Sequence, residues 1–326
     1  MNDDYLWDRS GRSDPQIQHL ENVLSQFQGG KKLPDLPQRS SRKSDHSRFS
    51  LWTTLAAATA AAAIIVFAFS GNQSVPMEQA KPSWKVAVLQ GTPRYGSLPI
   101  SGSGHLAVGD WLETDPTSLV RLIMPKIGQV EVNPQTRIRI KVASEKEYRL
   151  ELASGKIHAT VLAPPRLFLV ETPSALAVDL GCSYNLEVNQ QGDGFLQVAT
   201  GWVAFEREGH ESVVPAGAQC KTKKGIGLGT PYFPDATEKF TAALARFDFG
   251  TNKAHALDTV LAESRTRDGL TLWHLLSRVE GADRARVFNQ LVLYSPLPSG
   301  VTKEGVLRLD PKMLKQWFEG LKDPQG

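Results

Sequence analysis

One stretch of the chain is long enough and apolar enough to cross a lipid bilayer. Residues 49–77 contain no Asp, Glu, Lys, Arg or His, and their core at 51–69 reads LWTTLAAATAAAAIIVFAF. A helix of that length rises about 28 Å, close to the roughly 30 Å thickness of the hydrocarbon layer. We therefore expect one transmembrane helix at 49–70. The alternatives are an Ala-rich helix buried in a soluble domain, which would normally keep a polar face, and a cleaved signal peptide, which would have a shorter polar leader.

Basic residues are distributed unevenly on the two sides of this apolar segment. Six Lys and Arg residues lie within 31–48, whereas only Lys81 and Lys85 follow the segment closely. Lys and Arg are enriched on the cytoplasmic side of membrane helices. We therefore expect residues 1–48 in the cytoplasm and residues after about 71 outside, with the lipid bilayer between them.

The cytoplasmic segment is too short to form an ordinary domain with its own core. Asp14 and Pro15 suit the cap and the first position of a helix at about 14–28, after which Gly29 ends it. Apolar residues recur on this helix at spacings of three and four, and we expect them to form a partner-binding face: Ile17, Leu20, Leu24 and Phe27. Residues 31–48 form a basic linker. The alternative is a disordered tail with nascent helix.

After a polar linker at 71–83, the pattern changes to short runs in which apolar and polar residues alternate. Examples are Tyr148–Leu152 and Lys156–Leu162, which Gly155 separates. Gly, Pro, Asn or Asp lies in nearly every gap between such runs, up to about residue 230. Many short strands at even spacing predict a mainly β external domain at 84–230, which is a sandwich, a barrel or a β-solenoid.

The period changes again in the last part of the chain. From 231 to 326, apolar residues recur at helical spacing, as at Phe240, Leu244 and Phe247. Asp310 followed by Pro311 is typical of a helix start. We expect a C-terminal helical region of four or five short helices, which either forms a small bundle of its own or packs on one end of the β-domain.

Charge and motif content exclude several classes of function. The 37 Lys and Arg residues nearly balance the 34 Asp and Glu residues, so no nucleic-acid partner is expected. The seven histidines lack the spacing of a helical zinc site, and the chain has no P-loop and no nucleophile elbow. We therefore predict a protein that is not an enzyme, with no catalytic residue, no cofactor and no metal site.

One strand carries basic residues on a single face: Arg137, Arg139 and Lys141. No acidic residues are evident in register with them, so we expect an exposed basic face that weakly favours acidic glycans or envelope lipids. Two aromatic pairs are interpreted as core residues rather than ligand-binding residues: Trp273 with His274, and Trp317 with Phe318.

The order of several short motifs resembles the FecR domain, named for the ferric citrate regulator. The pieces lie between about residues 84 and 222, and they include VGDWLET at 108–114, SLVRL at 118–122, VNPQT at 132–136, FLVETP at 168–173 and GWV at 201–203. Each piece alone is weak, but their order and spacing make the resemblance fairly specific. It implies a cytoplasmic segment, one transmembrane helix and a periplasmic domain that is a twisted β-solenoid or sandwich-like.

The resemblance also implies transmembrane signalling. The best known members of the family contact an extracytoplasmic-function sigma factor in the cytoplasm and receive a signal from an outer-membrane transporter. We therefore expect a sensor or anti-sigma-type regulator in a bacterial inner membrane. Its expected partners are a cytoplasmic sigma factor or other regulator, and a periplasmic or outer-membrane protein or an envelope glycan. Two other classes stay open: a membrane-tethered envelope scaffold that sends nothing inward, and a surface enzyme acting on glycans.

Cys182 and Cys220 are the only cysteines of the chain, and both fall on the side expected to be oxidising. We expect a disulfide between them that holds the last β-segment against an inner one. In the related FecR-domain proteins that the chain resembles, a Gly-Cys pair and a later Cys after Pro-Ala-Gly appear together, which supports the pairing. The alternative is two buried free thiols, because Cys is often buried.

Overall fold

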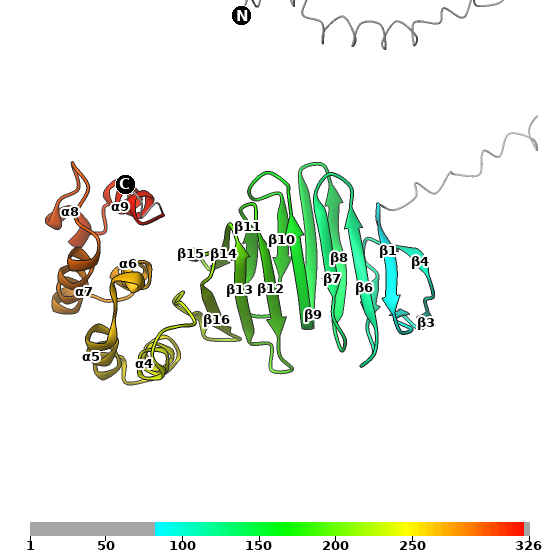
Figure 1. Ribbon diagram of the computed structural model, residues 1–326, viewed down its shortest axis with the longest axis horizontal. Coiled ribbons are helices and arrows are strands. Elements are labelled where there is room, and N and C mark those ends of the chain that lie inside the picture. The colour runs from blue at the N-terminus through cyan, green and yellow to red at the C-terminus, as the bar shows by residue number, and fades with distance from the viewer. Residues whose placement is uncertain (1–81, 323–326) are drawn as a thin grey trace, which may run out of the picture. The chain divides into compact units, whose positions relative to one another are not determined.

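The computed structural model describes residues 82–322 (Figure 1). The predicted transmembrane helix at 49–70 and the predicted helix at about 14–28, with Ile17, Leu20, Leu24 and Phe27, lie outside the described residues. Within 82–322, every helix falls short of the length or the apolar character that a membrane crossing requires.

Strands between Ser83 and Leu228 form two sheets that share the long strand β9 (Glu147–Val161). Sheet A runs in the order β4 (Ser103–Ala107), β1 (Ser83–Gln90), β6 (Leu119–Met124), β7 (Gly128–Val132), β9, β12 (Ser183–Val188), β13 (Gly194–Thr200), β16 (Gln219–Lys223) and β17 (Gly227–Leu228). Sheet B runs in the order β3 (Leu98–Pro99), β2 (Arg94–Tyr95), β5 (Trp111–Glu113), β8 (Arg137–Ser144), β9, β10 (Phe168–Glu171), β11 (Leu176–Asp179), β14 (Trp202–Arg207) and β15 (His210–Pro215).

Strand β9 belongs to both sheets because it passes from one to the other at its middle. Its first half pairs with β8 and β10 in sheet B, and its second half pairs with β7 and β12 in sheet A. Gly155 lies at the crossing with φ +95°, and a Cβ there would meet the Cα of Thr136 at 2.4 Å. The sequence predicted two strands separated at Gly155, whereas the structure has one continuous strand that changes sheets at this glycine.

The core lies between the two sheets. Leu122, Val130 and Ile157 of sheet A and Ile138 and Leu150 of sheet B are all fully buried in one apolar cluster. Neighbouring strands are antiparallel throughout the described region except for β10, which is parallel to β9. The fold is therefore mainly β with two facing sheets, as in the sandwich-like alternative of the prediction, and the solenoid alternative is not confirmed.

Residues after the sheets form a C-terminal helical region as predicted, with six α-helices in the described residues rather than four or five. Its elements are α4 (Glu238–Phe249), α5 (Lys253–Glu263), the 3₁₀ turn η1 (Thr266–Asp268), α6 (Gly269–Leu276), α7 (Gly281–Tyr294), α8 (Lys303–Leu307) and α9 (Pro311–Lys322). Asp310 caps α9 as expected, because its side chain accepts hydrogen bonds from the backbone N–H groups of Lys312 and Met313. The helices share a core of their own in which Phe240, Leu272 and Trp317 are fully buried.

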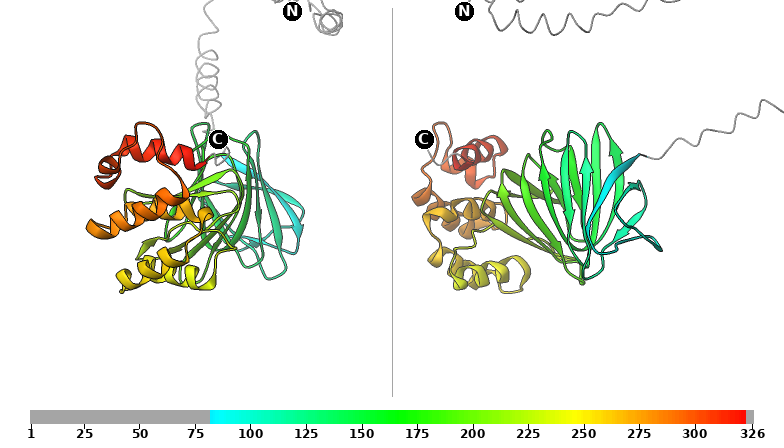
Figure 2. Two further views of the ribbon diagram at one scale, coloured as in Figure 1. Left: turned by 60° about the vertical axis from the view of Figure 1, so that its left-hand side comes forward. Right: turned by 45° about the vertical axis from the view of Figure 1, so that its right-hand side comes forward.

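The helical region also packs on the outer face of sheet B. Figures 1 and 2 show the helices gathered beside β11–β16 rather than beside β1–β8. The contact is a separate apolar cluster made by strands β10, β11, β14 and β15 and helices α6 and α9: Leu169, Val178, Ala204, Val213, Leu270 and Phe318. The two alternatives for the helical region therefore both apply, since it has its own core and also covers part of the β-domain. Of the aromatic pairs predicted as core residues, His274, Trp317 and Phe318 are buried, whereas Trp273 is partly buried against both clusters.

Candidate functional site

The basic residues predicted to form an exposed face on β8 are paired with acids from other strands of sheet B. The three ion pairs are Arg137–Glu113 at 3.0 Å, Arg139–Glu151 at 2.5 Å and Lys141–Glu171 at 3.0 Å. The prediction of an unpaired basic face was therefore wrong. The acids come from β5 and β9, which pair with β8, and from β10, which lies on the far side of β9, so their positions are set by the folded sheet rather than by the sequence of one strand.

Trp111 lies within this charged ladder. The guanidinium groups of Arg137 and Arg139 lie 4.1 and 4.5 Å from the centre of its ring. Contacts of a cation with an aromatic face, together with the ion pairs, hold both arginines in place. This part of sheet B is therefore internally neutralised and offers little attraction for an anionic ligand.

Cys182 and Cys220 do not form the predicted bridge, and both are free buried thiols. Cys220 lies opposite Leu196 of β13, whereas Cys182 precedes β12 at the end where that strand meets Thr200 of β13. Strand β13 thus lies between the two cysteines, which are also at different heights along it. The number of cysteines and their compartment suggested a bridge, but only the strand register decides whether two cysteines meet.

Asp179 is a buried carboxyl next to Cys182. It is 1% exposed, accepts a hydrogen bond from the Gly181 N–H at 2.7 Å, and accepts another from the Cys182 thiol. None of the ion pairs within 82–322 involves Asp179. Burial raises the pKa of Asp179 to about 6, and the hydrogen bonds from Cys182 and Gly181 oppose that rise only in part.

No group of His, Cys, Asp and Glu side chains between residues 82 and 322 is arranged to hold a metal ion. His274 is buried with its Nε2 3.2 Å from the carbonyl oxygen of Val213, and burial lowers its pKa to about 3. It therefore stays neutral and donates to the edge strand β15, which is a structural role.

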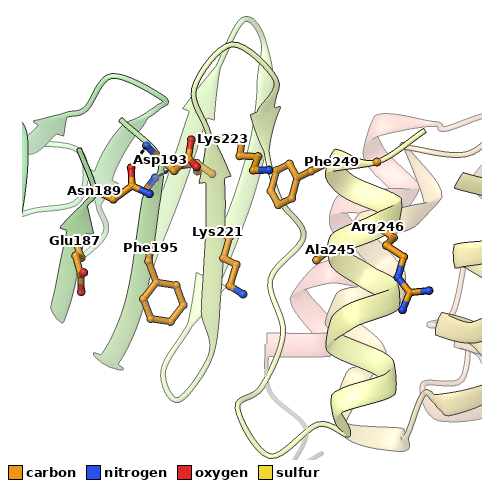
Figure 3. Close-up of a pocket in the computed structure, with 12 residues that line it drawn as sticks. Glu187, Asn189, Asp193, Phe195, Lys221, Lys223, Ala245, Arg246 and Phe249 are labelled. Carbon is orange, nitrogen blue, oxygen red and sulfur yellow. Dashed lines mark hydrogen bonds between the residues drawn. The ribbon is translucent and has the colours of Figure 1, made fainter. Parts of the chain in front are cut away.

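A cleft of about 560 Å³ lies between the outer face of sheet A and helix α4 (Figure 3). Its sheet side is a cross-strand row in which Glu187 of β12 lies opposite Phe195 of β13, and Phe195 lies opposite Lys221 of β16. These side chains face outward because the residues that alternate with them face the core, as the fully buried Leu196 and Cys220 show. The cleft is thus built on a rigid sheet.

The other wall of the cleft comes from the helical region. Ala245 and Phe249 of α4 line it, and the Lys223 ammonium lies 5.9 Å from the centre of the Phe249 ring. Figure 3 shows Phe195 and Lys221 on the sheet side, Phe249 beside Lys223, and Arg246 directed away from the sheet. The cleft therefore combines two aromatic rings with the two lysines that alternate along β16.

A buried ion pair fixes α4 beside the sheet. Arg278 donates to Asp248 of α4 at 3.0 Å and also to the Ser212 hydroxyl and the Gly229 carbonyl, both on the β side. Thr230 donates to Asp248 from its backbone N–H and from its hydroxyl. Burial raises the pKa of Asp248 although Arg278 opposes this. The network sets the width of the cleft, because it ties the helix wall to the sheet wall.

A second, larger cleft of about 1100 Å³ lies between strands β14 and β15 of sheet B and the helical region. Trp202, Phe233 and Tyr294 line it together with several prolines. Its cations already have partners, since Arg267 pairs with Asp235 and Lys322 pairs with Glu319. This cleft is therefore mainly apolar and offers no unpaired charge that would select a ligand.

The sequence did not identify the residues of the first cleft. Only Lys221 and Lys223 could be weakly indicated by the sequence. They alternate with Cys220 and Thr222, which are buried, as residues on the outward face of a strand do. Nothing in the sequence places Phe249 beside them, since that contact depends on where α4 packs.

Comparison with known proteins identifies one region of the chain. Residues 110–204 match the family model described as FecR protein. The chain contains a FecR domain. The matched region ends within β14, so strands β12 and β13 of the first cleft belong to the FecR domain, whereas β16 and α4 lie beyond it. FecR is a regulatory family rather than an enzyme family.

Two solved structures are similar to part of the chain. Both are of one provisionally assigned anti-sigma factor from Parabacteroides distasonis, at 1.65 and 2.50 Å resolution. They are 21% identical with a TM-score of 0.34, and the alignment covers 41% of this chain and 63–64% of theirs. The chain thus spans less than two thirds of the length of these structures. Comparison with curated proteins finds no match.

Proposed function

We propose that the chain is a single-pass regulator of a bacterial inner membrane. In this proposal the β-domain senses a ligand or partner protein on the periplasmic side, and the segment before residue 49 contacts a sigma factor or another cytoplasmic regulator. The observation that carries the proposal is the FecR domain at 110–204, because the family is a signalling family.

The charge pattern of the N-terminal part supports the topology of this proposal. The apolar segment at 49–70 is long enough to span a bilayer, and the basic residues at 31–48 favour a cytoplasmic N-terminus. The sensing part would then include both clefts, since all of their lining residues follow the apolar segment.

A capture experiment with the full chain in bacterial membranes tests the inward contact. We expect a tagged wild-type chain to recover a sigma factor, and the double variant Leu20→Asp, Leu24→Asp to recover it tens-fold less or not at all. Each leucine buried in a partner contributes about 1.5–3 kcal/mol, and a buried carboxylate adds a further cost. Quantitative mass spectrometry of the captured proteins gives the ratio.

The matched control is Gln18→Asp with Asn22→Asp, which adds the same charges at the same spacing on the opposite side of the predicted helix. This control should recover as much sigma factor as the wild type. Equal recovery by all three chains would show that the helix is not the docking surface. Recovery of no sigma factor by the wild type would favour a membrane-tethered envelope scaffold instead.

A further inference from the structure

We propose that the cleft between sheet A and α4 binds an acidic oligosaccharide, with Phe195 stacking on a sugar ring and Lys221 and Lys223 binding its carboxylates. That this oligosaccharide is the ligand sensed by the protein rests on the function proposed above. Its binding can be measured without any sigma factor.

Among the described residues, the lysines of this cleft form no ion pair, unlike the basic residues of strands β6 and β8. Arg121, Arg139 and Lys141 each form an ion pair with a glutamate on another strand. Lys221 and Lys223 form no such pair with any residue described between 82 and 322, and both are exposed. Their charge is therefore available to a ligand, and a carboxylate is the group that an ammonium binds through charge-assisted hydrogen bonds.

The polar groups on the opposite rim of the cleft are mostly occupied. The Asn189 side-chain oxygen accepts from the N–H groups of Gln191 and Asp193, at 3.0 and 2.9 Å. The Asp193 carboxylate accepts from the Lys224 N–H at 3.1 Å. These two side chains therefore hold the turn before β13, and Glu187 is left as an acceptor for a ligand hydroxyl.

The aromatic residues favour a ring-shaped ligand. Phe195 and Phe249 line the same cleft from its two walls, and Phe195 lies directly between Glu187 and Lys221 in the cross-strand row. The C–H face of a pyranose ring packs on such a ring, while hydroxyl and carboxylate groups at its edge reach an acid and a lysine on either side. The cleft volume of about 560 Å³ falls in the usual range of ligand sites, roughly 300–1,000 Å³.

An acidic peptide fits this cleft less well than a sugar. Extended peptides are usually held by main-chain hydrogen bonds to an open strand edge. Here β16 is paired with β13 on one side, and on the other side with β17, with the Gly229 N–H and with Tyr232. The cleft therefore offers side chains only, and side chains are the groups that would bind the hydroxyls and carboxylates of a sugar.

Calorimetric titration of the full chain in detergent micelles tests the proposal, with tetragalacturonate as the probe and the neutral cellotetraose as its comparison. We expect tetragalacturonate to bind and cellotetraose to bind at least tenfold more weakly. Phe195→Ala and the double variant Lys221→Gln, Lys223→Gln should each weaken tetragalacturonate binding tenfold or more. The affected side chains lie on the surface, and a melting curve checks that each variant is folded.

The matched control is Lys85→Gln with Lys146→Gln, which removes two exposed, unpaired lysines elsewhere in the β-domain. It should leave the affinity for tetragalacturonate within twofold of the wild type. Poly-glutamate is the second probe and should bind weakly and without dependence on Phe195.

Three results would overturn the proposal. Equal loss of affinity in the control and in the cleft variant would reveal a general effect of net charge. Poly-glutamate binding as tight as that of tetragalacturonate would reveal a site for acidic peptides. Absence of tetragalacturonate binding would exclude the proposed site for an acidic sugar, while capture of a sigma factor by the same protein would leave the regulator proposal standing.

Discussion

Asp179 gives the β-domain a specific dependence on pH. Its pKa is raised from 3.8 to about 6 by burial, so the folded chain binds the proton more tightly than the unfolded chain does. The folded state is therefore favoured most below about pH 4, and this contribution is lost as the pH rises from 4 to 6. The loss is on the order of 2–3 kcal/mol, since each pKa unit corresponds to about 1.4 kcal/mol.

The variant Asp179→Asn should remove this loss. We expect the free energy of unfolding of the variant to rise relative to the wild type by roughly 2–3 kcal/mol between pH 4 and pH 7.5, as measured by urea denaturation. The control is Asp115→Asn. Hydrogen bonds from Thr117 lower the pKa of Asp115 rather than raise it, so this variant should not show the same rise in the free energy of unfolding. A wild-type and Asp179→Asn pair with the same pH dependence would contradict the burial argument.

Gly155 is the residue that allows β9 to change sheets. Its φ of +95° is unfavourable for any residue with a side chain, and a Cβ would also meet the Thr136 backbone at 2.4 Å. We expect Gly155→Ala to lower the free energy of unfolding by more than about 2 kcal/mol in a denaturation experiment.

The control for Gly155→Ala separates the cost of the positive φ from the cost of the contact between the added Cβ and Thr136. Gly109 has nearly the same φ, +98°, and an added Cβ there meets nothing within 4 Å. Gly109→Ala should therefore cost only the conformational part, about 1 kcal/mol. Equal losses in both variants would show that the contact with Thr136 does not matter.

At the scale of elements, the contact between the helices and sheet B depends on aromatic packing. Phe318 of α9 is 8% exposed, and the centre of its ring lies 4.7 Å from the ring centre of Trp273 and 6.0 Å from that of Trp202. We expect Phe318→Ala to destabilise the protein by roughly 3–4 kcal/mol and to raise amide exchange in α6 and α9 before β6–β8. Leu293→Ala on α7, where the residue is 74% exposed, should change neither quantity. A uniform rise in amide exchange across all elements of Phe318→Ala would argue against a contact that can open separately from the rest of the β-domain.

The strands could be predicted wherever one face meets the core and the other meets water. Strands β6 and β12 alternate strictly between buried residues and residues that are at least partly exposed, and the same alternation is visible in their sequences. Strand β14 lacks this alternation, because Val203 and Ala204 are both buried on opposite faces. Val203 lies in the core between the sheets, and Ala204 lies under the helices. The position of helices on a sheet is a tertiary property, so neither this covering nor the cleft beside α4 follows from local pattern.

The ion pairs of β8 illustrate the same limit at a site. Arg137, Arg139 and Lys141 were recognised as one face, but their glutamates lie on other strands. Which residues stand opposite each other depends on register, and β9 is shifted twice against β8 by irregular positions. The sequence therefore predicted the residue types of this face correctly and its net charge wrongly.

At the scale of the whole molecule, the proposed function needs an inward helix, a membrane segment and an outward FecR-containing β-domain with its helices. The charge asymmetry around 49–70 and the FecR match at 110–204 support this order. A reversed orientation would place the proposed sugar cleft in the cytoplasm, where acidic envelope glycans do not occur. Orientation is thus the claim on which the rest depends.

Labelling of single introduced cysteines in intact cells measures this orientation directly. The native Cys182 and Cys220 are buried, so a membrane-impermeant maleimide should leave the unmodified chain unlabelled. With the outer membrane made permeable, we predict rapid labelling of Ser299→Cys and none of Ser40→Cys, with both labelled after lysis. Labelling of Ser40→Cys from outside, with Ser299→Cys protected until lysis, would contradict the account.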